Sequence, residues 1–229
     1  MSNDTIRGRM PDGGPVYTET DMGHFIVEPW NAVSSLLIVL PAVYWLIVIR
    51  KDLRQFGFLL FSIVLIILGG TGSTLFHAFR ASRFFLFLDV IPSAILTLSI
   101  SIFFWIKILN RWWHVLLIIL PAYSLRFVIF SILPDDTAIN VSYAIAGAVA
   151  ALPIVIILFR TGFFRYVEVA LTIILFSLAL VFREVDFASS RYLPMGSHFL
   201  WHVFTGFGAY FILSYLYHFR KRELSDDHN

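Results

Sequence analysis

The chain has 229 residues, of which 59% are hydrophobic and 14% are charged, and its mean hydropathy is +0.81. Soluble domains are close to half apolar and a quarter charged, so this composition requires lipid as the solvent and leaves no room for a separate soluble domain. The formal charge of +2 comes from basic residues in short clusters between apolar segments, which favours topology signals over a nucleic-acid-binding patch. Cysteine is absent, which excludes disulfides, thiolate metal sites and cysteine nucleophiles.

The first 27 residues form a polar segment that contains Asp12, Glu19 and Asp21. This segment lacks the basic start and the apolar run of a cleavable signal peptide. We therefore expect the first membrane span to direct insertion by itself.

Apolar runs predict seven membrane-spanning helices, because each span needs roughly 20 mainly apolar residues. The predicted spans cover about 30–49, 57–77, 84–106, 113–132, 138–159, 166–184 and 198–218. Gly69, Gly70 and Gly72 leave open a break between the second and third spans. The predicted fold is all-α, a polytopic seven-helix transmembrane bundle at 28–219, between a polar N-terminal segment (1–27) and a polar tail (220–229).

The orientation follows from lysine and arginine residues, which are retained beside spans on the cytoplasmic side. They follow every odd-numbered span: Arg50, Lys51, Arg54, Lys107, Arg111, Arg160, Arg165, Arg220, Lys221 and Arg222. The sequence therefore predicts an outside N-terminus and a cytoplasmic C-terminus. Arg80 and Arg83 are the two basic residues that disagree with this arrangement.

Polar residues within the spans are few, and ionisable ones cost roughly 2.5–3.5 kcal/mol each on insertion scales, so they usually mark function. Under the predicted topology the polar residues of interest fall at one level, near the outer face. They are Glu28, Asn31, Ser73, His77, Asp89, Asp186, His198 and His202. Because helices of alternating direction contribute them, a random scatter would divide them between the two leaflets.

His198 and His202 are four residues apart, so both imidazoles lie on one face of the last helix. Two ligands from one helix suit a tetrahedral metal, and a catalytic zinc takes three protein ligands and leaves a position for water. His77 is the predicted third ligand. Ser73 lies one turn before His77 and can donate to an oxyanion or orient the water, while Asp89 can accept its proton.

Each of these residues also has a structural interpretation. The two histidines of the last helix can form hydrogen bonds within the bundle or face lipid headgroups. Ser73 can serve as a small residue between packed helices. Glu28 and Asn31 can cap the first span. Asp186, beside Arg183 and Glu184, can belong to an ordinary cluster of loop charges.

Four blocks in order give the chain a resemblance to a known family: the segment from Glu28 to Ser34, the Ser73-x-x-x-His77 motif followed by Asp89, Arg183–Asp186, and Gly196–His202. Together they resemble the alkaline ceramidases, in particular bacterial-type members. This family belongs to the CREST superfamily of seven-helix membrane hydrolases, which includes the adiponectin and progestin receptors. The likeness covers about residues 28 to 215.

The resemblance implies that His77, His198 and His202 bind zinc and that Ser73 and Asp89 assist its water. The implied reaction is hydrolysis of the amide of ceramide-like N-acyl sphingoid lipids, giving a fatty acid and a long-chain base. The implied place is a bacterial inner membrane, with the site toward the periplasmic face and no obligate protein partner. The family's N-terminal calcium motif is not matched here; Glu28, Asn31 and Asp186 are assigned to ligand support or to a calcium-like site.

Two other functions are weighed against the hydrolase. A lipid-sensing, receptor-like protein would use the metal as a closed structural site with a fourth protein ligand. A transporter or channel would need polar residues through the cytoplasmic half of the bundle as well, and the sequence has none comparable there.

Overall fold

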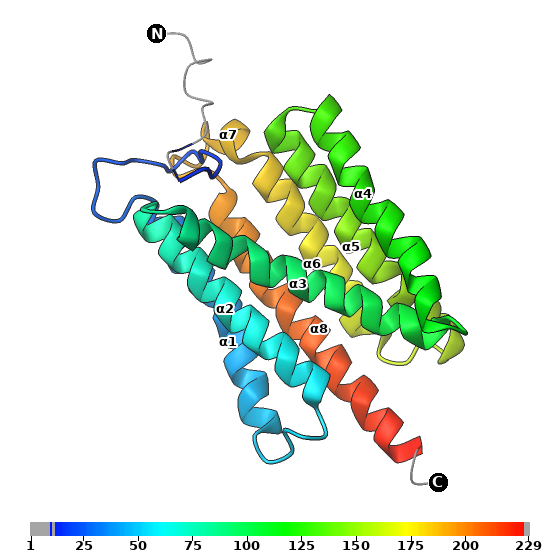
Figure 1. The fold of residues 1–229 in the computed structure, drawn as a ribbon. Coiled ribbons are helices and arrows are strands. Elements are labelled where there is room, and N and C mark those ends of the chain that lie inside the picture. The colour runs from blue at the N-terminus through cyan, green and yellow to red at the C-terminus, as the bar shows by residue number, and fades with distance from the viewer. Residues whose placement is uncertain (1–9, 11, 227–229) are drawn as a thin grey trace.

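The fold is built of α-helices joined by loops, with no β-strand in residues 10 and 12–226, the part of the chain described in a computed structural model (Figure 1). In chain order the elements are α1 (Pro29–Ile49), α2 (Gly57–Phe79), α3 (Arg83–Ile108), the 3-10 helix η2 (Trp112–Val115), α4 (Leu116–Ile132), α5 (Asp135–Arg160), α6 (Tyr166–Glu184), α7 (Asp186–Ser189) and α8 (His198–Asp226). Seven helical segments are long and apolar enough to cross a membrane: α1, α2, α3, η2 with α4, α5, α6 and α8. The chain is therefore an integral, multi-pass membrane protein with a seven-helix bundle, as its apolar pattern predicts.

The last helix is longer than the sequence predicts. The predicted span ends at about residue 218, whereas α8 continues to Asp226, so most of the predicted polar tail is helical. Glu223 forms ion pairs with Lys107 at the end of α3 and with Arg220 one turn earlier in α8. These pairs hold the polar end of α8 against the bundle, and the helix therefore continues beyond the last residue of the apolar pattern.

The glycines of the second span do not break it, since α2 runs through Gly69, Gly70 and Gly72. A Cβ atom on Gly70 would lie 2.7 Å from the side chain of Val39 in α1, and one on Gly72 would lie 2.4 Å from the backbone of Leu88 in α3. Small residues allow membrane helices to approach this closely. The glycines therefore bring α1 and α3 against α2 at the level of Ser73.

The C-terminal helix α8 packs against α1, α2 and α6, while α5 contacts α3, α4 and α6 (Figure 1). The main core lies between α1, α2, α3 and α8 and includes the buried side chains of Ile63, Phe104, Leu213 and Tyr215. The opposite faces of the helices carry exposed apolar side chains, among them Phe127 of α4, which is 80% exposed. Such an apolar outer surface is suited to lipid.

The polar N-terminal segment covers the end of the bundle where α2 ends and α8 begins (Figure 1). Its backbone is tied to α2 and to α7. Val27 N–H donates to the carbonyl of Ala78 at 2.9 Å, and Glu28 N–H donates to the carbonyl of His77 at 3.1 Å. Thr18 N–H donates to the carboxylate of Asp186 at 2.8 Å. The segment is therefore part of the structure around the histidines.

Candidate metal centre

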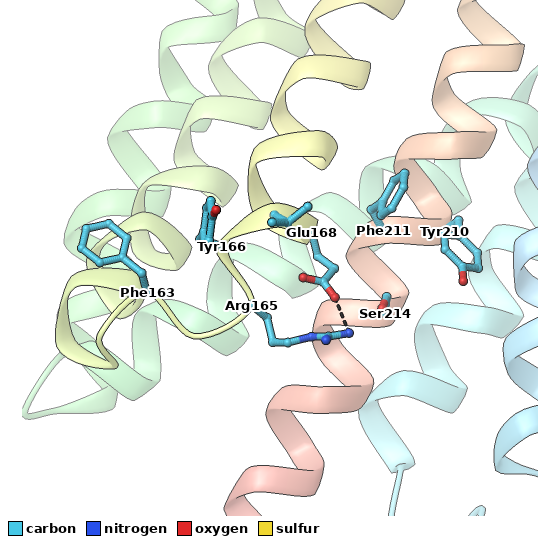
Figure 2. A pocket seen from close by; sticks show the side chains of 8 residues that line it. Phe163, Arg165, Tyr166, Glu168, Tyr210, Phe211 and Ser214 are labelled. Carbon is cyan, nitrogen blue, oxygen red and sulfur yellow. Dashed lines mark ion pairs between the residues drawn. The ribbon is translucent and has the colours of Figure 1, made fainter.

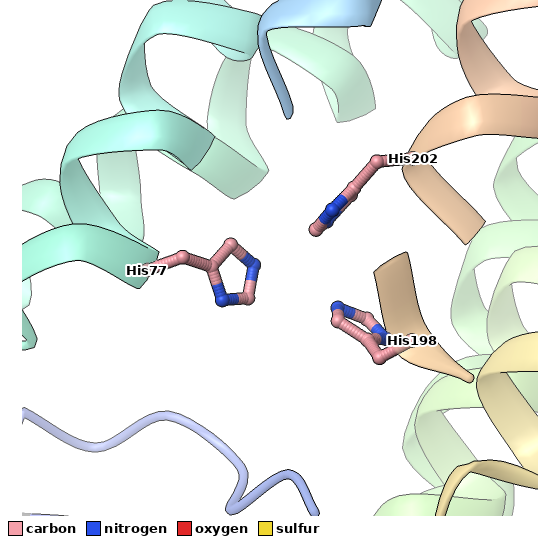
Figure 3. Close-up of side chains that lie close together, drawn as sticks. All are labelled: His77, His198 and His202. Atoms are coloured by element: carbon pink, nitrogen blue, oxygen red, sulfur yellow. The ribbon is translucent and has the colours of Figure 1, made fainter. Parts of the chain in front are cut away.

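Three histidines from two distant helices meet inside the bundle (Figure 3). His77 lies in the last turn of α2, while His198 and His202 lie in the first two turns of α8. Each side chain is at most 2% exposed, and one ring nitrogen of each lies within 4.8 Å of those of the other two. The structure thus brings together the three residues predicted as metal ligands.

A buried carboxylate holds the ring of His77. The Nδ1 atom of His77 bonds to Oε2 of Glu28, whose Oε1 accepts bonds from Arg80 and from the hydroxyl of Thr20, each at 2.6 Å. Burial disfavours the charged form of Glu28, but the neighbouring His77 and Arg80 lower its pKa to about 2. With Nδ1 occupied by the carboxylate, Nε2 of His77 remains for a metal.

Hydroxyl groups of α1 hold the ring of His202. Its Nδ1 atom lies 2.9 Å from the Oγ of Ser34 and 3.3 Å from the Oγ of Ser35. Both serines donate to the carbonyl of Asn31 one turn earlier, which orients them. These bonds again leave the Nε2 atom toward the centre of the cluster.

The third ring, that of His198, is held by a stacked aromatic ring. Its Nδ1 atom is buried without a hydrogen-bond partner among the described residues. The ring of Tyr17 stacks on it with centroids 3.8 Å apart and planes 20° apart. The backbone N–H groups of His198 and Ser197 both donate to Oδ1 of Asp186, each at 2.8 Å. The N-terminal segment and Asp186 therefore position His198 together.

Ser73 and Asp89 lie beside the cluster. Ser73 is buried, and its hydroxyl lies 3.0 Å from that of Ser35, next to His202. The carboxylate of Asp89, near the start of α3, interacts with the Ser73 hydroxyl and lies in the electrostatic field of His77. The two residues predicted to assist a water thus border the three imidazoles.

The remaining predicted residues, Glu28, Asn31 and Asp186, are all buried around the cluster. Glu28 supports His77. Asn31 is the third residue of α1, where its backbone N–H bonds to Glu19 and its side-chain amide to Glu28. Asp186 holds backbone N–H groups at the start of α8. The alternative that Glu28 and Asn31 cap the first span is wrong, because neither side chain caps α1 and Glu19 accepts the N–H groups of Trp30 and Asn31 instead.

An internal cation lies among the acidic groups that could attract calcium. The buried guanidinium of Arg80 binds both carboxylate oxygens of Asp12, at 2.6 and 3.0 Å, together with the carboxylate of Glu28 and the carbonyl of Pro15. Burial opposes its charge, but Asp12 and Glu28 raise its pKa. Two of the carboxylates, Asp12 and Glu28, are thus already paired with this side chain. Arg80, which disagreed with the predicted orientation, ties the N-terminal segment to α2.

The three imidazoles can hold a metal ion. Zinc binds neutral imidazole nitrogen at about 2.0–2.1 Å in tetrahedral sites, which places its ligands about 3.4 Å apart. The observed nitrogens lie within 4.8 Å of one another, so the rings would draw closer together to share one ion. Among the described residues the group contains no fourth histidine or carboxylate, which leaves a position open for another ligand.

A pocket of about 520 Å³ lies elsewhere, between the start of α6 and the middle of α8 (Figure 2). Arg165 and Glu168 form an ion pair on its wall, beside Tyr210 and Ser214. It contains none of the three clustered histidines and lies toward the other end of α8. A variant in this pocket can therefore serve as a control for variants of the metal centre.

Sequence reasoning missed several residues of the centre: Tyr17, Ser34, Ser35 and Arg80. Two serines in an apolar helix and a tyrosine in a polar segment carry no spacing signal.

Comparison with protein-family models and with curated proteins finds no match to this chain.

Proposed function

We propose that the protein is a zinc-dependent amide hydrolase that cleaves ceramide-like N-acyl sphingoid lipids to a fatty acid and a long-chain base. The observation that carries the proposal is the meeting of three buried imidazoles with a serine hydroxyl and a carboxylate, with an open ligand position. The resemblance of the four sequence blocks to alkaline ceramidases supplies the substrate class. Zinc bound there would polarise the amide carbonyl and acidify a water molecule.

The residues around the centre each have a part in the proposed reaction. Glu28 and the two serines of α1 keep the rings of His77 and His202 oriented. Ser73 donates its hydroxyl hydrogen bond to the developing oxyanion. Asp89 takes a proton from the attacking water and returns it to the leaving nitrogen. The amide C–N bond breaks, the water oxygen joins the acyl carbon, and the nitrogen leaves as the amine of the long-chain base.

The open position distinguishes this proposal from a lipid-sensing receptor with a structural metal. A structural zinc site is closed by a fourth protein ligand. Here the described residues supply three, and the carboxylate beside them, Asp89, contacts a serine as well. These features favour a site that admits water and substrate.

The direct test is fatty-acid release by purified, zinc-loaded protein in lipid nanodiscs supplied with N-acyl sphingoid lipids of several chain lengths. Wild type should release fatty acid, and the His198→Ala variant should lose both metal and activity. The Glu168→Gln variant, altered at the pocket of Figure 2, is the matched control and should keep both. Zinc-loaded wild type that releases no fatty acid from any of these lipids would contradict the proposal.

We further propose that the metal centre faces the periplasm of a bacterial inner membrane. The loops at the opposite end of the bundle carry the clustered basic residues, which are retained in the cytoplasm. The chain has no cysteine, so single introduced cysteines report orientation without background. Asp21→Cys should react with an impermeant thiol reagent in intact cells, whereas Asp226→Cys should not; the reverse pattern would contradict the orientation.

A further inference from the structure

Two arginines, Arg183 and Arg126, lie inside the α6 and α4 spans. Arg183 lies in the last turn of α6, and Arg126 lies in the second half of α4. Neither forms an ion pair with any residue that the structure describes. Arginine in a span costs roughly 2.5–3.5 kcal/mol on insertion scales and usually marks function. A ligand with a negatively charged group would compensate a positive charge at this position.

Arg183 borders the metal centre. It interacts electrostatically with Asp89, with both His198 and His202, and with Tyr17, whose ring covers His198. Its guanidinium also lies over the ring of Trp201, 5.8 Å from the centroid. A group bound by Arg183 would thus lie beside the three imidazoles.

The contacts of Arg183 are neutral. Its NH1 atom donates to the amide oxygen of Asn140, and it lies 5.4 Å from the ring centroid of Tyr143. A guanidinium has five N–H donors, so these partners position the group but do not use all of its donors, and Asp89 opposes its charge without forming an ion pair. Tyr143 also lies in the field of Arg126, which places a second cation near the same ring. The two arginines reach this region from α6 and α4.

We propose that Arg183 forms a binding site for an anionic group of the lipid ligand, and that the site favours lipids with a negatively charged headgroup. A phosphate or sulfonate matches the fork of donors that a guanidinium presents. The inference rests on the proposed function only in treating the bound lipid as the substrate. A carboxylate has the same chemistry, so the fatty acid left after cleavage is the other source to be distinguished.

The experiment compares ligand pairs that differ only in charge. The first pair is an N-acyl sphingoid phosphate and the neutral N-acyl sphingoid with the same chain; the second is a fatty acid and its fatty alcohol. Apparent dissociation constants come from thermal-shift titrations of purified, zinc-loaded protein in neutral detergent. Wild type should bind the phosphate lipid about tenfold more tightly than its neutral partner, or more, as expected for charge-assisted hydrogen bonds.

Arg183→Gln should remove this preference, and Arg183→Lys should retain part of it. Arg160→Gln is the matched control, because Arg160 ends α5 at the far end of the bundle and its loss removes the same charge. If only the fatty acid shows a preference that depends on Arg183, the site binds the carboxylate of the product. Absence of any charge preference, or a preference that survives in Arg183→Gln, would overturn the inference.

Hydrolysis is measured separately on the same samples. Charge-dependent binding that requires Arg183, without any release of fatty acid, would refute the proposed reaction and leave the anion site standing. Hydrolysis that is equal for charged and neutral lipids in wild type and in Arg183→Gln, with equal binding, would leave the reaction standing and refute the anion site.

Discussion

The carboxylate of Glu28 is the most informative residue to change, because it reaches a metal ligand without being one. It bonds to Nδ1 of His77 and to the guanidinium of Arg80, and it is fully buried. In Glu28→Gln the side chain keeps its size and one acceptor oxygen but loses its charge. The one remaining oxygen cannot serve both His77 and Arg80, so the ring of His77 loses the charged acceptor that fixes its orientation and raises its basicity.

The expected effect is a tenfold to hundredfold weaker metal affinity, about 1.4–2.7 kcal/mol, which is typical of losing such a supporting carboxylate. The variant should destabilise the fold less than if Glu28 were the sole partner of Arg80, because Arg80 keeps its two bonds to Asp12. We expect the metal-free protein to lose about 1–3 kcal/mol of unfolding free energy, the usual cost for a hydrogen bond to a charged group.

Zinc affinity is measured by competition with a chromogenic chelator, and stability is measured by thermal unfolding of metal-free protein in the same detergent. Glu168→Gln is the control, because Glu168 also pairs with an arginine, Arg165, but lines the separate pocket of Figure 2. The control should leave zinc affinity unchanged. An unchanged affinity in Glu28→Gln, with the protein folded, would refute the view that Glu28 holds a metal ligand.

Three further predictions concern the surroundings of the centre. Tyr17→Phe keeps the ring that stacks on His198 and should retain zinc affinity, whereas Tyr17→Ala should weaken it about tenfold in chelator competition; equal affinities would refute the positioning role. Asp186→Ala removes the acceptor of three backbone N–H groups and should cost about 2–4 kcal/mol in thermal unfolding; a loss below the assay error would contradict the capping role. Gly206→Ala would place a Cβ 2.6 Å from a backbone oxygen of α1 and should lower the free energy of unfolding by about 1–3 kcal/mol. Gly147→Ala is the control and should not destabilise the protein, because the space around Gly147 is open. Equal effects of the two variants would refute the close approach of α8 and α1.

The helices were predictable because membrane insertion is decided by local composition. Each span needs only its own apolar residues, and the observed α1, η2 with α4, and α6 begin and end within a residue or so of the predicted limits. The level of the three histidines was also predictable, since adjacent spans alternate in direction. His77 ends the second span and His198 begins the seventh, which runs in the opposite direction, so both lie at the same end of the bundle.

The supporting residues were not predictable, because their partners are distant in sequence. Arg80 meets Asp12 across 68 residues, and Ser34 meets His202 across 168. No local spacing encodes such pairs. The sequence instead showed Arg80 as a positive charge on the wrong side of the membrane, a conflict that the structure explains by its burial between two carboxylates.

The count of metal ions bound per chain tests the central claim most directly. Elemental analysis of purified protein should find one ion per chain in wild type and none in His77→Ala or His202→Ala. His114→Ala should retain the ion, because His114 lies in η2, outside the cluster. A wild type that binds no metal when supplied with it, or variants that keep their ion without these imidazoles, would contradict the account.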